Sequence, residues 1–415
     1  MNFKIMLQIR LAGQNNLIRK RSLQLHQQIR AGIIVLALIL SLGFSQEQFL
    51  PENPLKGRIV FEQKGCATCH SINFNYAQIG PSLGTDNSYG RPLSLASTMW
   101  NHLPKMLLQI NELGIQFPKF SKTEFSELMA YLFYLNYLGE PGNTYQGKDL
   151  ISEKKCTICH SIGAKGGSVG PPFDSFQKYN SPVFLAQALW NHGPAMDSEL
   201  KKAGLSRPTF EKNDLSNLNA YIRIASQNSS TSKIFMSPGN PQKGGVLFQE
   251  KGCVNCHAIN GSGGNTGPDL AEKDWGYSVS EIAGILLNHS LPMYDYMETN
   301  QLDWPQFQDN ELADIISFLY FLGFTDKPGD PIAGEKVLGE KGCLSCHISD
   351  KRGKNNAPDL SKTKNLVSGI DMALIMWNHA PIMEKKASEM VLFWPSLSGT
   401  EMADLYAYLS TVKRN

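Results

Sequence analysis

The chain has 415 residues, of which 42% are hydrophobic and 18% charged, so it is long enough for several globular domains and too apolar for an intrinsically disordered protein. Its 39 Lys and Arg nearly balance its 37 Asp and Glu, which by composition excludes a nucleic-acid-binding protein. All eight cysteines lie in one repeated motif, and none remains for a structural disulfide.

Residues 1–45 have the composition of a signal peptide or N-terminal anchor. Six basic residues and no acidic residue precede or flank a mostly apolar run over residues 31–44. This run is shorter than the roughly 20 residues of a membrane-spanning helix, and Gly43-Phe44-Ser45 offers small residues for cleavage before Gln46. We expect cleavage; the alternative is an anchor that associates with the membrane through residues 31–44. Either way the remaining chain is exported, to the periplasm or the outer side of the cytoplasmic membrane.

A five-residue motif, Cys-x-x-Cys-His, begins at residues 66, 156, 253 and 343. Two thiols at this spacing, followed directly by histidine, are typical of c-type haem attachment, in which the histidine becomes the proximal iron ligand. Zinc binding and thioredoxin-like redox chemistry fit an exported chain less well. The predicted cofactor is four covalent haem c groups, bound by Cys66, Cys69, Cys156, Cys159, Cys253, Cys256, Cys343 and Cys346, with proximal ligands His70, His160, His257 and His347.

The chain contains four copies of one module, one around each motif. Counted from the motif, the same residues recur at the same offsets in all four copies, without insertions or deletions. A glycine lies nine residues before the first cysteine, and a proline lies eleven residues after the motif histidine. A second histidine follows that proline after 21 residues, and a methionine follows the histidine after four. The prolines are Pro81, Pro171, Pro268 and Pro358; the second histidines are His102, His192, His289 and His379; the methionines are Met106, Met196, Met293 and Met383.

Apolar periodicity predicts an all-α fold with three helices in each module. In the first module a short helix from about Leu55 leads into the motif, and a second covers about residues 94–106. The third helix begins at a capping box formed by Ser121 and Glu124, with its counterpart at Ser398 and Glu401. No alternating pattern indicates a strand.

The repeat also predicts the domain boundaries. Four domains are expected at residues 46–142, 143–226, 241–328 and 329–415, after the signal peptide or anchor at 1–45. A polar linker at 227–240 makes the middle junction seven residues longer than the others. We therefore expect two pairs of modules, the first with the second and the third with the fourth, joined by a hinge.

The sixth iron ligand has two candidates in each module. Met106 and His102 are four residues apart, so on a helix both side chains lie on one face. The same holds for their counterparts in the other modules. The spacing alone leaves this choice open.

Each module resembles a class I c-type cytochrome domain, and the resemblance covers nearly the whole chain from about residue 54. It implies that the Gly-Pro loop around Pro81, Pro171, Pro268 and Pro358 offers a carbonyl to the proximal histidine. It also implies a distal methionine after the third helix, which favours Met106, Met196, Met293 and Met383. The second histidines are then alternative ligands or neighbours that tune the site. The sequence departs from the family because Pro118, which begins the Pro-x-Phe segment, lies twelve residues after Met106 rather than directly after it.

Other repeated residues have simpler interpretations. Trp100, Trp190 and Trp377 are expected to pack against haem or the last helix. Phe120 and its counterparts at 210, 307 and 397 are expected in the core. The lysine two residues before each motif, Lys64, Lys154, Lys251 or Lys341, is expected to be solvated.

These features predict an exported electron carrier with six-coordinate haems and no catalysis of its own. Without residues 1–45 the chain keeps 33 Lys and Arg against 37 Asp and Glu, so a redox partner with a basic docking patch is expected. One alternative is a peroxidase-like enzyme with one open haem. Others are a haem-based sensor and a cytochrome subunit of a membrane-bound oxidoreductase complex.

Overall fold

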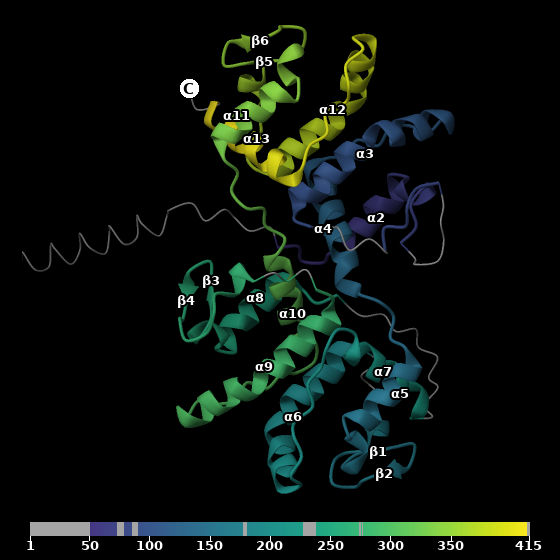
Figure 1. Ribbon diagram of the computed structural model, residues 1–415, viewed down its shortest axis with the longest axis vertical. Coiled ribbons are helices and arrows are strands. Elements are labelled where there is room, and N and C mark those ends of the chain that lie inside the picture. The colour runs from purple at the N-terminus through teal and green to yellow at the C-terminus, as the bar shows by residue number, and fades with distance from the viewer. Residues whose placement is uncertain are drawn as a thin grey trace, which may run out of the picture. The chain divides into compact units, whose positions relative to one another are not determined.

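The computed structural model describes residues 50–72, 79–84, 90–176, 181–226, 238–273, 275 and 277–412. This part of the chain is mainly helical, with twelve α-helices, which confirms the all-α prediction (Figure 1). The expected signal or anchor at 1–45, including 31–44, and most of the linker at 227–240 lie outside the described residues. Among the helices that are described, none is long and apolar enough to cross a membrane.

The same order of elements recurs four times, as a short helix, a 3-10 turn at the cysteine motif, a long helix and a last helix. Modules 1 to 4 denote these four segments below. Module 1 contains α2 (Lys56–Gln63), α3 (Pro92–Glu112) and α4 (Lys122–Leu138). Module 2 contains α5 (Thr144–Glu153), β1 (Ser161–Ile162), β2 (Lys165–Gly166), α6 (Pro182–Lys202) and α7 (Asp214–Ala225). Module 3 contains α8 (Pro241–Glu250), β3 (Ala258–Ile259), β4 (Ser262–Gly263), α9 (Val279–Thr299) and α10 (Glu311–Leu322). Module 4 contains α11 (Pro331–Glu340), β5 (Ile348–Ser349), β6 (Arg352–Gly353), α12 (Gly369–Glu389) and α13 (Gly399–Val412).

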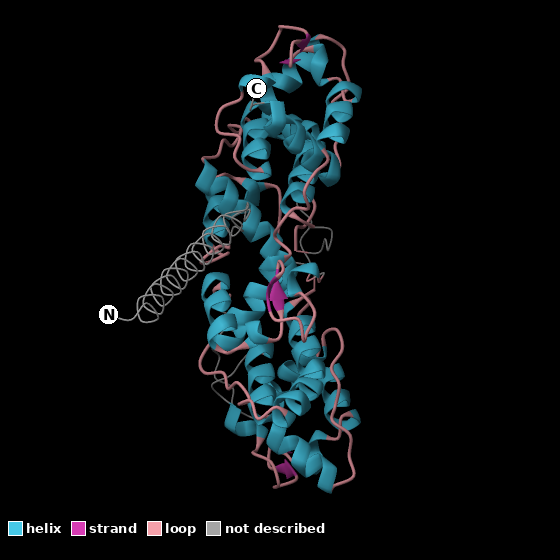
Figure 2. Cartoon of the chain, turned by 90° about the vertical axis from the view of Figure 1, so that its left-hand side faces the viewer, coloured by secondary structure: helices cyan, strands magenta, loops and turns pink. Residues whose placement is uncertain are grey.

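The elements differ from the sequence expectation in two details. Among the described residues, strands occur as three antiparallel hairpins directly after the motif in modules 2, 3 and 4, each with two-residue strands too short for an alternating pattern to reveal (Figure 2). Helix α3 continues six residues past Met106 to Glu112, through a segment whose polar residues face solvent. The two predicted capping boxes are both present, with reciprocal hydrogen bonds between Ser121 and Glu124 and between Ser398 and Glu401.

The repeated glycine before each motif lies where the first helix crosses the last helix of its module. A Cβ atom on Gly57 would lie 1.9 Å from the backbone oxygen of Glu127 in α4. The corresponding distance is 2.0 Å for Gly147, Gly244 and Gly334. Only glycine allows the two helix backbones to approach this closely, which explains why the residue recurs at this offset.

The modules do form two pairs, but the pairing differs from the expected one. Module 1 pairs with module 4, and module 2 pairs with module 3, as the neighbouring helices α3 and α12 and the neighbouring helices α6 and α9 show in Figure 1. The connector between modules 3 and 4 lies on module 1, because the Leu93 N–H donates to Asp326 Oδ1 at 2.9 Å at the start of α3. Length and polarity of a linker limit how far a chain can reach, but they do not decide which surfaces bind each other.

Each pair is held by the same hydrogen bonds made in both directions. Asn101 donates to the Leu397 carbonyl at 2.8 Å and accepts from the Leu397 N–H at 2.9 Å. From the other side, Asn378 makes the same two bonds with Phe120. Asn191 with Phe307 and Asn288 with Phe210 repeat the arrangement between modules 2 and 3. Such reciprocal contacts are the mark of an approximate twofold interface.

The tryptophans before these asparagines pack across the same interfaces rather than within their own module. Trp100 stacks on Trp394 with ring centroids 4.3 Å apart, and Trp190 stacks on Trp304 at 4.5 Å. A proline inside each long helix contributes, because Pro104 has no N–H to bond to the carbonyl of Trp100 four residues earlier. That carbonyl instead accepts from the Trp394 indole at 3.1 Å, and the Trp190 carbonyl accepts from Trp304 at 3.3 Å.

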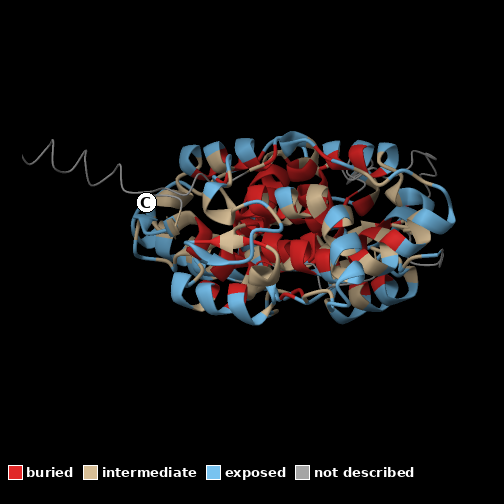
Figure 3. Cartoon of the chain, turned by 90° about the horizontal axis from the view of Figure 1, so that it is seen from above, coloured by how far each residue is buried: buried red, intermediate tan, exposed pale blue. Residues whose placement is uncertain are grey.

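An aromatic cluster joins module 1 to module 3. Phe133 and Tyr137 of α4 pack on Tyr320 of α10, with ring centroids 4.5 and 4.9 Å apart. The Tyr320 hydroxyl donates to the Phe133 carbonyl. Figure 3 shows that buried residues concentrate where the helices meet, and the buried state of Phe120, Phe210, Phe307 and Leu397 agrees with their expected place in the core.

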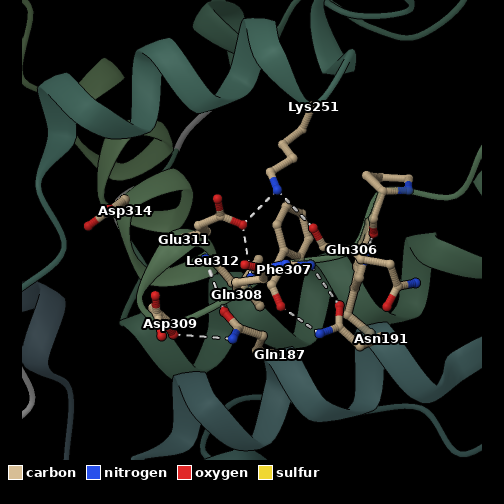
Figure 4. A network of polar contacts seen from close by, with 12 residues as sticks. Gln187, Asn191, Lys251, Gln306, Phe307, Gln308, Asp309, Glu311, Leu312 and Asp314 are labelled. Atoms are coloured by element: carbon tan, nitrogen blue, oxygen red, sulfur yellow. Dashed lines mark hydrogen bonds and ion pairs between the residues drawn. The ribbon is translucent and has the colours of Figure 1, made fainter.

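The lysine before each motif is a structural contact, which corrects the expectation that it is solvated. Lys251 donates to the Gln306 carbonyl at 2.9 Å and forms an ion pair with Glu311 at 2.7 Å (Figure 4). The C-terminal end of α8, just before the motif, is thereby tied to the loop before α10. The other three lysines make the same two kinds of contact, with side chains only 16 to 27% exposed.

Candidate haem-attachment sites

The two cysteines of each motif flank one turn of 3-10 helix. A residue with positive φ precedes the turn, Gly65 in module 1 with φ 79° and Lys155 in module 2 with φ 56°. The N–H of His70 then donates to the Cys66 carbonyl at 2.9 Å, and the other motif histidines do the same at 3.0 Å. The turn therefore fixes the positions of the two thiols and the histidine relative to one another, within a segment of five residues.

All eight thiols are free and partly buried. Burial raises the pKa of the first cysteine of each motif, Cys66, Cys156, Cys253 and Cys343, to about 11. In the described part of the chain, no three His, Cys, Asp or Glu side chains cluster as a bare metal site.

Each motif histidine is oriented by a backbone carbonyl. Nδ1 of His70, His160, His257 and His347 lies 3.0, 2.8, 3.1 and 2.8 Å from the carbonyl oxygen of Pro81, Pro171, Pro268 and Pro358. A carbonyl only accepts, so Nδ1 carries the proton and Nε2 keeps its lone pair for a metal. A hydrogen bond of this kind also fixes the ring plane and raises the basicity of the ligand.

In modules 1, 2 and 3 the residue before the proline is a glycine that lies against the imidazole. A Cβ atom on Gly170 or Gly267 would lie 2.3 Å from the Cε1 atom of His160 or His257. Module 4 has Ala357 here, and its loop is displaced by one residue. The N–H of Asn356 donates to the second cysteine's carbonyl, whereas in the other modules the glycine N–H does so. The loop shift makes room for the alanine side chain while the bond from His347 to Pro358 is kept.

The long helix supplies the opposite wall. His102, His192, His289 and His379 each face the motif histidine of their own module. Burial, followed by the charge of the facing histidine, lowers the pKa of all four. They are therefore neutral near pH 7, the form in which imidazole binds iron. Met106, Met196, Met293 and Met383 lie one helical turn further on and are partly buried.

In module 2 these residues enclose a cavity of about 1250 Å³. Its lining includes Cys156, Cys159, His160, His192 and Met196. The cavity is large enough for a cofactor, and two thiols and two imidazoles in its lining fit a covalently bound haem.

Arg207, in the wall of the same cavity, forms an ion pair with Asp197. Arg207 Nη1 lies 2.7 Å from Asp197 Oδ2, and both side chains are largely buried. Burial raises the pKa of Asp197 even though Arg207 acts in the opposite direction. The other modules have an aromatic residue where module 2 has Arg207, so this site differs electrostatically from the other three.

Sequence reasoning missed the roles of two sets of residues that shape these sites. The asparagine before each second histidine holds the module pair together, and the lysine before each motif fixes the turn. The sequence did contain a signal for the asparagine and for the lysine, because each recurs at a constant offset from the motif. A buried partner for either side chain is visible only in the tertiary structure.

Comparisons with known proteins agree with this chemistry. Residues 241–322 and 332–413 each match the family model of cytochrome c, so the chain contains c-type cytochrome domains in these two segments. A cbb3-type cytochrome c oxidase subunit FixPc from Rhizobium leguminosarum bv. viciae is 27% identical over 176 residues, which cover 38% of this chain and 61% of that protein. A cbb3-type cytochrome c oxidase subunit FixP from Rhizobium etli is 27% identical over 129 residues, 28% of this chain and 44% of that protein.

The chain thus spans less than two thirds of the length of both relatives. No solved structure matched it. Together the family match and the relatives support haem-based electron transfer and an all-α cytochrome c-like fold.

Proposed function

We propose that the protein is an exported tetrahaem c-type cytochrome that carries single electrons between redox partners. The observation that supports this most strongly is fourfold repetition. Each site has two partly buried thiols, a motif histidine oriented through Nδ1, and a second imidazole opposite. Bound haem would supply an iron that cycles between the ferrous and ferric states. Each site would accept one electron from a reduced donor and pass it to an oxidised acceptor.

The same repetition favours a carrier over a peroxidase-like enzyme. No module lacks the second histidine or the methionine, so no site differs from the others in the residues available to close the iron. Carbon monoxide tests this directly, because it binds reduced haem only at an open axial position. We expect no binding to the reduced protein; stoichiometric binding at one haem would instead support the enzyme.

The haem count has a direct test. Alkaline pyridine spectra and the intact mass of the exported protein should give four covalent haems per chain, and a reductive titration should consume four electrons. Replacing Cys253 and Cys256 with alanine should remove one haem and one electron. Fewer than four haems in the unmodified protein would refute the tetrahaem proposal.

A cytochrome subunit of an oxidase complex is the second candidate, and the names of the two relatives favour it. As a subunit, the protein should remain in the membrane fraction and copurify with a catalytic oxidase subunit after mild detergent extraction. As a diffusible carrier, it should be released with the periplasmic fraction. The N-terminal residue of the purified protein separates a cleaved signal peptide from an anchor.

A further inference from the structure

Two imidazole rings face each other at nearly the same separation in every module. The ring centroids of His70 and His102 are 6.3 Å apart, and the counterparts in modules 2, 3 and 4 are 6.2, 6.3 and 6.5 Å apart. The residues between each second histidine and its methionine differ among the modules, but the separation does not. The separation of the two imidazole rings is therefore a shared property of all four sites.

The distance suits a metal ion held between the rings. It is longer than the 5.0 Å that separates the ring centroids of His160 and Phe173. A bond from a metal to an imidazole nitrogen is about 2.0–2.1 Å, and the nitrogen lies about 1.1 Å from the ring centroid. Two imidazoles on opposite sides of one metal therefore have centroids about 6.3 Å apart.

Both rings also line one cavity. In module 2, His160 and His192 share the 1250 Å³ cavity with both cysteines of the motif. Nδ1 of His160 is bound to the Pro171 carbonyl, so Nε2 is its only metal-binding atom. The second histidine is firmly placed as well, because the adjacent Asn191 is bound at both its amide atoms to Phe307 of module 3.

The methionines are placed differently from what the cytochrome resemblance implies. There the ligand methionine follows the third helix, whereas Met106 lies inside α3, which continues to Glu112. Met196, Met293 and Met383 likewise lie inside α6, α9 and α12. All four methionines are among the partly buried residues that pack on the hydrophobic core or line the cavity, a role that suits a flexible apolar side chain.

We infer that His102, His192, His289 and His379 are the distal iron ligands, so that each haem is bound by two histidines while Met106 and its counterparts serve as packing residues. This inference rests on the proposed haem binding. Two imidazoles would give lower reduction potentials than histidine with methionine, because a methionine ligand raises the potential of the iron.

Spectroscopy of the oxidised full-length protein tests the inference. Methionine bound to ferric haem gives a far-red charge-transfer band, and we expect this band to be absent at all four haems. The imidazole planes are inclined by 59 to 69°, so strongly anisotropic low-spin electron paramagnetic resonance signals are expected. A far-red band from any of the four haems would overturn the assignment for that module.

A matched pair of variants gives a second readout. With His102→Leu, the reduced protein should bind carbon monoxide at one haem, or the oxidised protein should gain a far-red band as Met106 takes the open position. Met106→Leu should do neither and should leave the potentials of all four haems unchanged. An open haem in Met106→Leu would refute the inference. If His102→Leu does not accumulate with haem, the spectra of the unmodified protein and of Met106→Leu still decide.

Haem content separates this inference from the proposed function. A chain with fewer than four haems would contradict the tetrahaem proposal, while the ligands of the remaining haems would still be readable. A chain with four haems and methionine bands would contradict only the histidine assignment.

Discussion

Lys64 and its counterparts join the turn at the cysteine motif to the start of the last helix of the same module. Lys64 binds the Lys119 carbonyl at 2.8 Å and Glu124 at 2.8 Å, so the residue before the cysteine motif is joined to the capping box of α4. The hydrogen bond from Lys64, together with the Ser121 N–H, lowers the pKa of Glu124 to about 2. Comparable lysine contacts, with the capping N–H groups, lower the pKa of Glu311 and Glu401.

This contact predicts a pH-dependent stability. A carboxylate whose pKa is lowered on folding stabilises the protein above its ordinary pKa of 4.5, and the contribution is lost as the pH falls from there through about 2. Glu124→Gln should therefore lower the free energy of unfolding at pH 7 by about 0.5 kcal/mol, a value typical of partly exposed ion pairs. Urea midpoints of both proteins should converge as the pH approaches 2.

Glu127→Gln in the same helix serves as the control, since the described structure shows no ion pair for the Glu127 side chain. A difference between Glu124→Gln and the unmodified protein that stayed constant from pH 7 to pH 2 would contradict the ionic explanation.

A strained valine at the end of α12 gives a prediction of the opposite sign. Val391 has φ 55° at the position where α3 and α6 end on Gly114 and Gly204, with φ 63° and 64°. A β-branched residue in this left-handed conformation costs about 1–2 kcal/mol relative to glycine. The side chain is 89% exposed, so little packing is lost when it is removed. Val391→Gly should raise the free energy of unfolding by about 0.5–1 kcal/mol after the greater entropy of the unfolded glycine is included.

The reverse change provides the comparison. Gly204→Val should destabilise the protein by about 1 kcal/mol or more in the same denaturant titration. If both variants shifted the midpoint in the same direction, backbone strain at this helix end would not be the cause.

At the scale of elements, the long helices serve both the haem sites and the module pairs. On α3, Asn101 binds module 4 while the next residue, His102, faces His70. A change at the interface therefore acts on the helix segment that carries His102. The residue that binds the partner module is adjacent to the proposed ligand rather than on a separate surface.

Asn101→Ala should weaken the pairing of modules 1 and 4. The substitution leaves the N–H and carbonyl of buried Leu397 without their partner, which costs about 1–3 kcal/mol. We expect a lower denaturant midpoint and altered ligand-sensitive bands of one haem. Asn111→Ala, at an exposed position of the same helix, should leave both unchanged. Equal effects of the two variants would show that replacing an asparagine of this helix, rather than losing the interface contact, is responsible.

At the scale of the whole molecule, charge sets the kinds of partner that approach readily. Residues 46–415 have 33 Lys and Arg against 37 Asp and Glu, and haem propionates would add negative charge. Electron transfer to an anionic oxidant such as ferricyanide should therefore become faster as salt is added, because salt screens the repulsion. Transfer to a cationic cobalt complex should become slower. The opposite salt dependence would argue against a partner with a basic docking patch.

The sequence by itself determined what each module contains. Helical periodicity and capping depend on residues only a few positions apart. The sequence alone was therefore sufficient to predict the helices of each module and both capping boxes. Fourfold repetition fixed the offsets of the cysteines, histidines, prolines and methionines, and the motif itself predicted covalent haem as the cofactor. These features depend on residues that are close together in the sequence, and the constant spacing repeats them in every module.

Only the tertiary structure decided how the modules meet and which side chain faces the proximal histidine. Every module presents an asparagine and a Pro-x-Phe or Pro-x-Leu segment, so the sequence allows several pairings, and the linker length suggested the wrong one. Likewise, His102 and Met106 share one helix face, and spacing cannot choose between side chains one turn apart. A separation of 6.3 Å between two rings is a relation between distant parts of the chain, and it exists only after the helices have packed.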